Sequence, residues 1–223
     1  MIKNEYKVIG VMSGTSLDGI DLTYITFIFD LSWSFKIEMS ETISYNEHWF
    51  KILKNIVTKS FKELQEIDTS YTLYLATTIK DFINRNNIKQ IDTVCSHGHT
   101  AYHKPEKGLT YQIGNKAELV SELNETIVCD FRVQDVNLGG QGAPLVPIGD
   151  QLLFYEYDFC LNLGGFANIS TVINGSRIAY DICPVNIGLN HYSELIGFQY
   201  DSEGKLASQG TINNQLLIQL NNL

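Results

Sequence analysis

"VIGVMSGTSLDGIDL", residues 8–22, is a turn rich in glycine and hydroxyl side chains that joins two apolar runs. The first run ends at Met12 and the second begins at Ile20, and their composition predicts a β-hairpin. A glycine-rich turn exposes successive backbone N–H groups at close range, which suits an anion. Asp18 and Asp21 would repel a bare phosphate, whereas their carboxylates suit a phosphate that carries Mg²⁺. The stretch therefore predicts a phosphate-binding hairpin of a kind other than the Walker pattern.

Strand and helix patterns follow one another through the first part of the chain. Ser60 and Glu63 fit the capping box that opens a helix, and the apolar residues after them recur at helical spacing. The predicted elements are strands over 6–12, 20–30, 34–45, 91–96 and 126–130, and helices over 46–57, 60–87 and 117–123.

The strongest shift in composition is "NLGGQGAPLVP", residues 137–147, which predicts a domain boundary. We expect a first lobe over 1–137, with the phosphate-binding hairpin, and the start of a second lobe over 138–223. The order of elements then repeats, with a second glycine-rich turn in "NLGGFANIS" at 162–170. This repeat predicts a two-lobed α/β protein whose two turns face one nucleotide. Its later elements are a helix over 148–155, strands over 159–163, 167–173 and 177–182, and a helix that Pro184 opens and that ends near Gly197.

Composition excludes several classes of protein. With 223 residues, 44% of them apolar, the chain can build a packed core. A formal net charge of −9 argues against binding to nucleic acid or to an anionic membrane surface. The N-terminus lacks the apolar segment of a signal peptide, no stretch is long enough to span a bilayer, and the cysteines stand singly. We therefore expect a reduced, cytoplasmic protein.

Six stretches together resemble the anhydro-N-acetylmuramic acid kinase family, in that family's order and at similar spacing, from about Tyr6 to His191. They are "GVMSGTSLDGIDL", "SHGHTAYH", "YQIGNKAEL", "DFRVQDVNLGGQGAPLVP", "LNLGGFANIS" and "YDICPVN". The resemblance implies a two-lobed, actin-like ATPase fold with a ribonuclease-H-like sheet in each lobe. It also implies a kinase of peptidoglycan recycling that uses ATP and Mg²⁺. Such a kinase phosphorylates the sixth-position oxygen of anhydro-N-acetylmuramic acid while water opens the anhydro bridge, which gives N-acetylmuramic acid 6-phosphate.

The resemblance assigns residues to the binding of ATP. The first phosphate loop would comprise Gly14, Thr15, Ser16, Leu17, Asp18, Gly19, Ile20 and Asp21. Gly164 and Gly165 would lie near the second loop. Within the first loop, Asp18 would also orient Mg²⁺ or the acceptor oxygen of the sugar.

The resemblance also assigns residues to the sugar and to catalysis. Asp181 matches the catalytic aspartate and would act as general base toward the water that attacks the anomeric carbon. Arg132 would bind the sugar's carboxylate through its guanidinium fork, and His97 would hydrogen-bond in the sugar pocket or between loop backbones. Judged without the family, Asp181 would be interpreted as a helix N-cap or turn residue, and Arg132 as a surface ion-pair partner of Asp130 or Asp135.

A function from a different class rests on the histidines of "SHGHTAYH". His97, His99 and His103 alternate on an extended segment, which is the arrangement of a metal-binding protein. No cysteine or acid nearby completes such a set, so we expect no stoichiometric zinc on these histidines.

Two departures from the family pattern bear on activity. Ile182 and Cys183 stand where the family has Thr-Gly after the catalytic aspartate. Family members are also longer, so we expect an incomplete second lobe with exposed apolar surface and unpaired strand edges, which would be poorly soluble or would form a homodimer through its open sheet. Residues 1–223 alone are then expected not to phosphorylate the sugar. The alternative is a non-catalytic remnant that binds muropeptide sugar through its first lobe.

Overall fold

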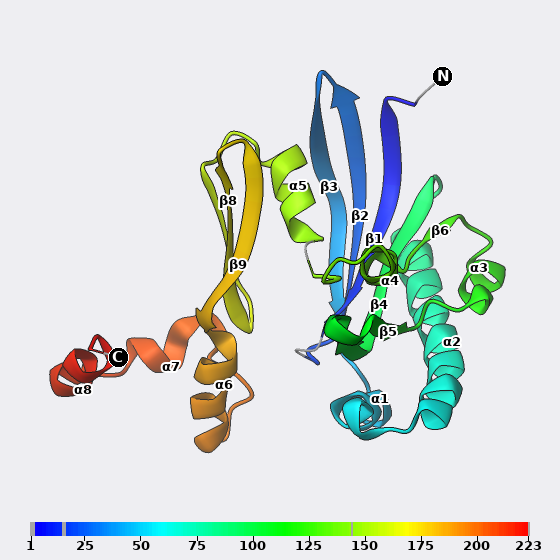
Figure 1. Cartoon of the computed structure of the whole chain (residues 1–223). Coiled ribbons are helices and arrows are strands. Elements are labelled where there is room, and N and C mark those ends of the chain that lie inside the picture. Colours follow the sequence, from blue (N-terminus) through cyan, green and yellow to red (C-terminus); the bar gives the residue numbers. More distant parts are fainter. Residues whose placement is uncertain (1–2, 15–16, 144, 223) are drawn as a thin grey trace. The chain divides into compact units, whose positions relative to one another are not determined.

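A six-stranded mixed sheet organises Met1–Glu156, the first of two compact units into which the chain divides (Figure 1). This computed structural model describes residues 3–14, 17–143 and 145–222. The strands of the first unit are β1 (Glu5–Ser13), β2 (Ile20–Asp30), β3 (Ser32–Ile43), β4 (Thr93–Lys104), β5 (Leu109–Ile113) and β6 (Ile127–Val128). Its helices are α1 (Glu47–Lys54), α2 (Phe61–Arg85), α3 (Ala117–Leu123), α4 (Phe131–Asn137) and α5 (Val146–Leu153), with short 3₁₀ turns at Ile56–Thr58 and Pro105–Lys107.

Strand β1 lies in the middle of this sheet, whose order is β3-β2-β1-β4-β5, with β6 also paired to β4. The first three strands form an antiparallel meander, and β1, β4 and β6 run parallel. A meander followed by parallel strands is the mixed α/β architecture predicted from the sequence, and it agrees with the N-terminal lobe of an actin-like ATPase. The C-terminal ends of β1 and β4 therefore meet at one end of the sheet.

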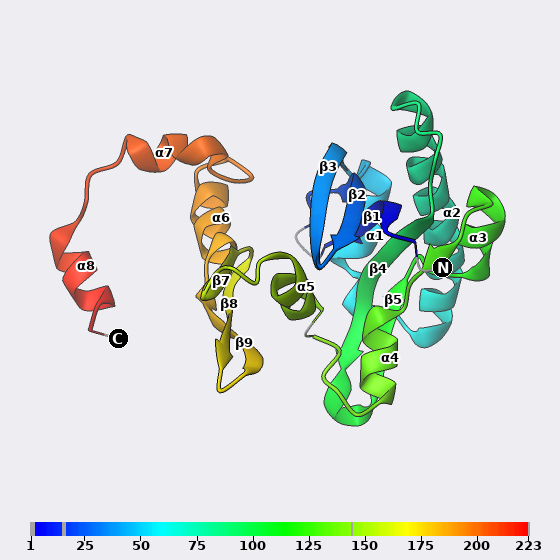
Figure 2. The same cartoon turned by 90° about the horizontal axis from the view of Figure 1, so that it is seen from above.

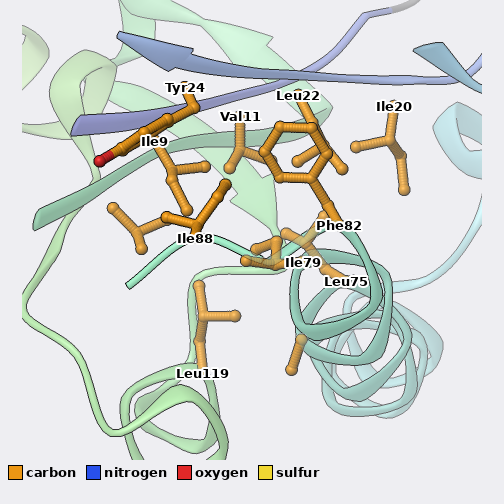
Figure 3. Packing of buried hydrophobic residues seen from close by; sticks show 12 residues of the cluster. Ile9, Val11, Ile20, Leu22, Tyr24, Leu75, Ile79, Phe82, Ile88 and Leu119 are labelled. Carbon is orange, nitrogen blue, oxygen red and sulfur yellow. The ribbon is translucent and has the colours of Figure 1, made fainter. Parts of the chain in front are cut away.

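The main core lies between this sheet and one layer of helices. Helices α2 and α3 cover the same face in both views (Figures 1 and 2), and Figure 3 shows their side chains against the strands. Ile9 and Leu22 point inward from β1 and β2 and pack with Leu75, Phe82 and Leu119, all of them fully buried. Each such side chain contributes about 1.5–3 kcal/mol of burial free energy. The alternation of apolar residues in the opening hairpin thus fixes which face of the sheet is covered.

A second core cluster lies below the glycine-rich turn. Trp49 of α1 packs edge-on against Tyr71 of α2, with ring centroids 5.0 Å apart. Leu53, Ile56 and Ile113 are buried in the same cluster. This cluster joins α1, α2 and the end of β5 into one support under the turn.

The first unit extends further along the chain than the boundary predicted after Asn137. Helix α5 packs on β3, where Phe154 meets Phe35 edge-on with ring centroids 5.8 Å apart. Strands β1, β2 and β3 and helix α5 line an open apolar groove of about 350 Å³, with Tyr6, Val8, Phe27, Trp33, Ile148, Gly149, Leu152 and Leu153 around it. The structure therefore separates its two units after Glu156, on the far side of the glycine- and proline-rich stretch.

The second unit, Tyr157–Leu223, is a three-stranded antiparallel sheet followed by short helices. Its elements are β7 (Phe159–Leu163), β8 (Phe166–Ile173), β9 (Ser176–Pro184), α6 (Asn186–Leu195), a 3₁₀ turn (Ser202–Gly204), α7 (Lys205–Ser208) and α8 (Asn214–Leu220). Many large apolar side chains of this unit are exposed, among them Phe159, Leu161, Leu163, Tyr180, Ile182 and Leu195. Exposed apolar surface on this scale is typical of a face that packs on something else.

Several element boundaries differ from those predicted. Strand β4 continues eight residues past Ser96, through the histidine-rich segment, and it pairs there with the unpredicted strand β5. Helix α4 was also not predicted. Pro184 is the last residue of β9 and not the start of the next helix, which begins at Asn186. None of the helices in the described part of the chain is long and apolar enough to cross a membrane.

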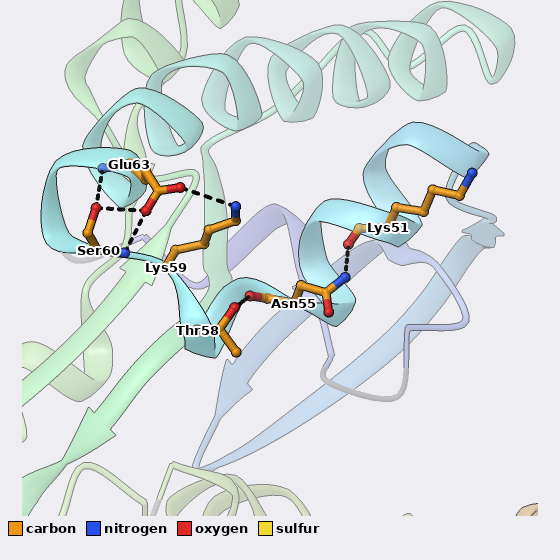
Figure 4. A network of polar contacts seen from close by, with 6 residues as sticks. All are labelled: Lys51, Asn55, Thr58, Lys59, Ser60 and Glu63. Atoms are coloured by element: carbon orange, nitrogen blue, oxygen red, sulfur yellow. Dashed lines mark hydrogen bonds and ion pairs between the residues drawn. The ribbon is translucent and has the colours of Figure 1, made fainter.

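The predicted capping box at the start of α2 is confirmed. Figure 4 shows it beside a second set of polar contacts, from Thr58 to Asn55 and from Asn55 to Lys51 of α1. Ser60 Oγ accepts from Glu63 N at 3.4 Å, and Glu63 Oε2 accepts from Ser60 N at 2.9 Å. Lys59 adds an ion pair of 3.2 Å to the same carboxylate. Hydrogen bonds from the backbone N–H and hydroxyl of Ser60, and then from Lys59, lower the pKa of Glu63 to about 2.

We predict that Ser60→Ala lowers the free energy of unfolding by about 1 kcal/mol, because it removes the N-cap acceptor of α2. The matched control is Ser70→Ala, an exposed serine of the same helix whose hydroxyl donates to Glu66 O at 3.2 Å. The control should stay within about 0.5 kcal/mol of the wild type. Urea denaturation followed by circular dichroism measures both. Equal effects of the two substitutions would contradict the capping role.

Candidate active site

The predicted phosphate turn follows directly from the end of β1. Thr15 and Ser16 lie outside the described residues, so their predicted roles rest on the motif alone. Leu17 takes a left-handed backbone conformation, with φ of 61°, and its N–H donates to Gly14 O at 3.4 Å. A Cβ at Gly19 would lie 2.5 Å from the carbonyl oxygen of Ile43, so only glycine fits there.

The remaining residues of the turn divide between solvent and core. Asp18 and Asp21 are exposed, and Asp21 Oδ1 accepts from the Thr42 hydroxyl at 2.6 Å. Ile20 is fully buried, so its side chain belongs to the core and only its backbone can face a ligand. The turn therefore presents carboxylates, whose oxygens can ligate a hard cation, and backbone N–H groups, which can donate hydrogen bonds.

A buried polar cluster lies at the base of the turn. Ser13, the last residue of β1, places its Oγ 2.6 Å from Tyr45 OH, 2.7 Å from Tyr71 OH and 3.0 Å from His99 Nδ1. The two tyrosine hydroxyls are 3.1 Å apart. Ser13, Tyr71 and His99 are each no more than 1% exposed. Burial, and then the nearby His97, lower the pKa of His99 to about 4, so this imidazole is neutral at pH 7.

An irregularity in β4 brings His97 out of the regular ladder. Val11 pairs with Ser96 and Ser13 pairs with His99, so β4 carries one extra residue opposite β1. Gly98 within this bulge has φ of 70°, and a Cβ there would lie 2.6 Å from Ile113 O. Such bulges re-aim side chains beside functional sites.

His97 and Arg132, both predicted to bind the sugar, are in contact. Arg132 lies in the first turn of α4, and its Nε donates to His97 Nε2 at 2.8 Å while its Nη1 donates to Gly142 O at 2.6 Å. His97 Nδ1 lies 2.8 Å from Gly98 O and is the donor when Nε2 accepts. Burial lowers the pKa of both side chains, and the charge of Arg132 further lowers that of His97. The pair is a neutral imidazole that orients a permanently charged guanidinium.

The ion pairs proposed as the alternative role of Arg132 are not found among the described residues. Asp135 instead accepts the Gly142 N–H on its Oδ2 at 2.6 Å, and a Cβ at Gly140 would collide with the same carboxylate. The glycines of "GGQGAP" are therefore needed to fold this segment back onto α4. The stretch that predicted a domain boundary is in fact part of the support of Arg132.

Sequence reasoning missed a second layer of support, which lies in "YQIGNKAEL". Asp68 is a buried carboxylate of α2 that accepts from Gly114 N at 2.7 Å and from Tyr111 OH at 2.6 Å. Asn115 then accepts from the Ser96 hydroxyl at 2.9 Å and donates to His97 O at 3.4 Å. The sequence did contain a signal for this support, because Asp68 is a polar residue on the apolar face of the predicted helix over 60–87.

The three histidines of β4 do not gather into a metal centre. His97 is held by Arg132, His99 by Ser13, and His103 Nδ1 lies 3.1 Å from the Thr110 hydroxyl. Over the described ranges, no group of three or more His, Cys, Asp or Glu side chains could hold a metal ion. All four cysteines are free thiols.

In the second unit, Gly164 and Gly165 form the turn between β7 and β8. Their carbonyls accept the N–H groups that open α6, with Val185 N donating to Gly165 O at 2.8 Å. A Cβ at either glycine would meet its nearest atom at 3.6 Å or more, and neither φ is positive. Packing therefore does not require glycine here, which leaves the close approach of a ligand as a physical reason for it.

Asp181 lies within β9, three residues before its end. It pairs with Asn168, and Cys183 pairs with Ala167, so Ile182 is the extra residue of a β-bulge. Asp181 is exposed. Neither alternative interpretation, a helix N-cap or a turn residue, is correct.

A family model described as "Anhydro-N-acetylmuramic acid kinase" matches residues 6–222. The chain belongs to the anhydro-N-acetylmuramic acid kinase family. Curated relatives of that name include those of Mannheimia succiniciproducens, at 38% identity over 99% of this chain, and Shewanella amazonensis, at 34% over 95%. The relative of Bacillus cereus is 33% identical over 94% of the chain. The chain spans about 60% of the length of each of these three kinases.

The low pKa of His99 predicts a pH dependence of folding. The unfolded chain binds a proton at His99 near pH 6.5 and the folded chain only near pH 4, so stability is fully present above pH 6.5 and falls between these values. We expect His99 to account for a loss of up to about 3 kcal/mol between pH 7 and pH 4. His99→Gln should remove this contribution from the measured slope.

The measurement is urea denaturation at several pH values between 4.5 and 7. His48→Gln, at an exposed histidine of α1, controls for the loss of one imidazole and should keep the wild-type slope. The same slope in His99→Gln and in the wild type would contradict the buried neutral state of His99.

Proposed function

We propose that this chain carries the phosphate-binding, sugar-binding and general-base residues of an ATP-dependent anhydro-N-acetylmuramic acid kinase. The observation that carries the proposal is the contact between His97 and Arg132, 35 residues apart in sequence, which the family motifs assign to one sugar pocket. A guanidinium without a carboxylate partner among the described residues suits the carboxylate of a muramic acid. We infer the identity of the sugar, anhydro-N-acetylmuramic acid, from family membership.

The turn after β1 would bind the phosphates of ATP through backbone N–H groups from Gly14 to Asp21. Mg²⁺ would supply charge neutralisation on the phosphates, and the exposed Asp18 would orient it. Gly164 and Gly165, which packing does not require, would allow a second close approach to phosphate. Phosphoryl transfer needs little from the protein besides such positioning and electrostatic stabilisation.

Arg132 would hold the sugar through Nη2, the guanidinium nitrogen that makes neither of its two described hydrogen bonds. Nε is fixed on His97 and Nη1 on Gly142 O, which orients the remaining N–H groups. Binding of a carboxylate at a partly buried guanidinium is a charge-assisted hydrogen bond, which is stronger than a neutral one. His97 would stay neutral and act as the acceptor that holds Arg132.

Asp181 would act as general base in the opening of the ring. It takes a proton from water as the water oxygen bonds to the anomeric carbon, and the bond from that carbon to the bridging oxygen breaks. The freed sixth-position oxygen takes the γ-phosphoryl group of ATP, and ADP leaves. The products are N-acetylmuramic acid 6-phosphate, ADP and the proton on Asp181.

The test is phosphoryl transfer by a protein of full family length that carries residues 1–223, with product identified by mass spectrometry. We expect Asp181→Asn to bind ATP normally and to lose about two to four orders of magnitude of turnover. Arg132→Gln should raise KM for the sugar by about 10- to 100-fold, since it removes a charge-assisted hydrogen bond.

The matched controls are Asp158→Asn, an exposed aspartate of the second unit, and Arg85→Gln, an exposed arginine that pairs with Glu41 at 2.7 Å. Both should keep wild-type kinetics. Near-wild-type turnover in Asp181→Asn would show that the base lies elsewhere. Saturable sugar binding without any turnover in the wild type would favour the non-catalytic alternative.

A further inference from the structure

The hydroxyl of Ser13 is unusually well bound for a residue that contacts no ligand in the proposed reaction. Three side chains from three different segments converge on its Oγ, namely Tyr45, Tyr71 of α2 and His99 of β4, at 2.6–3.0 Å. A hydroxyl has one proton and two lone pairs. All four contacts of the cluster, including the 3.1 Å contact between the tyrosines, are made when His99 Nδ1–H donates to Ser13, Ser13 donates to one tyrosine, that tyrosine donates to the other, and the second tyrosine donates back to Ser13. The cluster is thus closed and fully satisfied.

The fold itself does not require polar side chains at this place. Ser13, Tyr71 and His99 are no more than 1% exposed, in surroundings formed by Trp49, Ile113 and other apolar groups. Apolar side chains of similar volume would support the sheet without the desolvation cost of four polar groups. A satisfied polar network instead fixes one arrangement of the groups that it joins. What this network fixes is the direction of the chain as it leaves β1.

The other contacts of the turn lead to the same support. Leu17 packs against the second core cluster, which contains Tyr71. Gly19 lies against the backbone of Ile43, two residues before Tyr45. The turn is therefore held at its start by a hydroxyl, in its middle by an apolar side chain and at its end by backbone contact.

We propose that Tyr45, Tyr71 and His99 are positioning residues, which hold Ser13, and through it the described residues 14 and 17–19 of the following turn, in the arrangement that binds the phosphates of MgATP. The identification of MgATP as the ligand rests on the proposed function, whereas the anchoring of the turn through Ser13 does not. None of the three side chains needs to touch the nucleotide.

The test compares Tyr71→Phe with Tyr74→Phe in the 223-residue chain. Both tyrosines belong to α2 and lie against the ring of Trp49, at 5.0 Å and 5.2 Å between centroids, but only Tyr71 bonds Ser13. Each change removes one hydroxyl and keeps the ring. Tyr45→Phe, at a half-buried position, is the second variant and should behave as Tyr71→Phe does.

The first measurement is amide hydrogen exchange by NMR without ligand. We expect Tyr71→Phe to speed exchange of the Leu17 N–H by about tenfold, because the free energy of opening the turn falls by the contribution of one hydrogen bond. Exchange at Ile79 and Phe82, in the core of α2, should not change. Tyr74→Phe should leave the Leu17 rate as in the wild type.

The second measurement is calorimetric titration with MgATP and, separately, with the anhydro sugar. Tyr71→Phe should weaken MgATP binding by about tenfold and leave the sugar unaffected, a split that general destabilisation would not give. Unchanged Leu17 exchange in both Tyr71→Phe and Tyr45→Phe would overturn the anchoring claim. Faster exchange with unchanged MgATP affinity would overturn the positioning claim. A wild type that binds no MgATP would instead contradict the proposed function, with anchoring still decided by exchange.

Discussion

The pairing of Ser13 with His99, in the parallel ladder between β1 and β4, is the constraint on which the candidate site depends. Parallel strands end at the same edge of a sheet, and ligands of open α/β sheets bind at that edge. The extra residue in β4 just before His99 turns His97 toward Arg132, while the chain beyond Ser13 becomes the glycine-rich turn. One register therefore places the proposed phosphate turn and the proposed sugar pair at the same end of the first sheet.

Among the described side chains His97, His99 and Arg132, the two imidazoles are kept neutral and Arg132 stays charged. His99 is neutral because it is buried, and His97 is disfavoured as a cation by burial and by Arg132 beside it. Arg132 keeps its charge and is held through Nε and Nη1. These two neutral imidazoles orient their neighbours without adding charge.

Short sequence patterns predicted those elements whose signals lie within a few consecutive residues. The opening hairpin, the capping box at Ser60, the helix over 117–123 and the strand over 159–163 all follow from periodicity and turn chemistry. Helix α4 gave no such signal, because Asp130 before it has φ of 58° and caps nothing with its side chain. The histidine-rich half of β4 is a strand because β5 pairs with it, a contact that periodicity does not report.

Two signals were misleading for physical reasons that the structure supplies. Pro184 is a good first residue of a helix, but β9 is an edge strand, where a missing N–H is tolerated. The glycines near residue 140 have the composition of a linker, yet they allow the backbone to approach Asp135 and support Arg132. Family motifs predicted the residues of the candidate site. The contact between His97 and Arg132 and the cluster around Ser13 can be recognised only in the three-dimensional structure.

The most direct test of this account is a crystal structure of the chain with anhydro-N-acetylmuramic acid and a non-hydrolysable ATP analogue with Mg²⁺. We expect phosphate oxygens within about 3 Å of backbone nitrogens in the turn that follows Ser13, and the sugar carboxylate at the same distance from the Arg132 guanidinium. Phosphates bound away from that turn, or a sugar whose carboxylate does not contact Arg132, would contradict it.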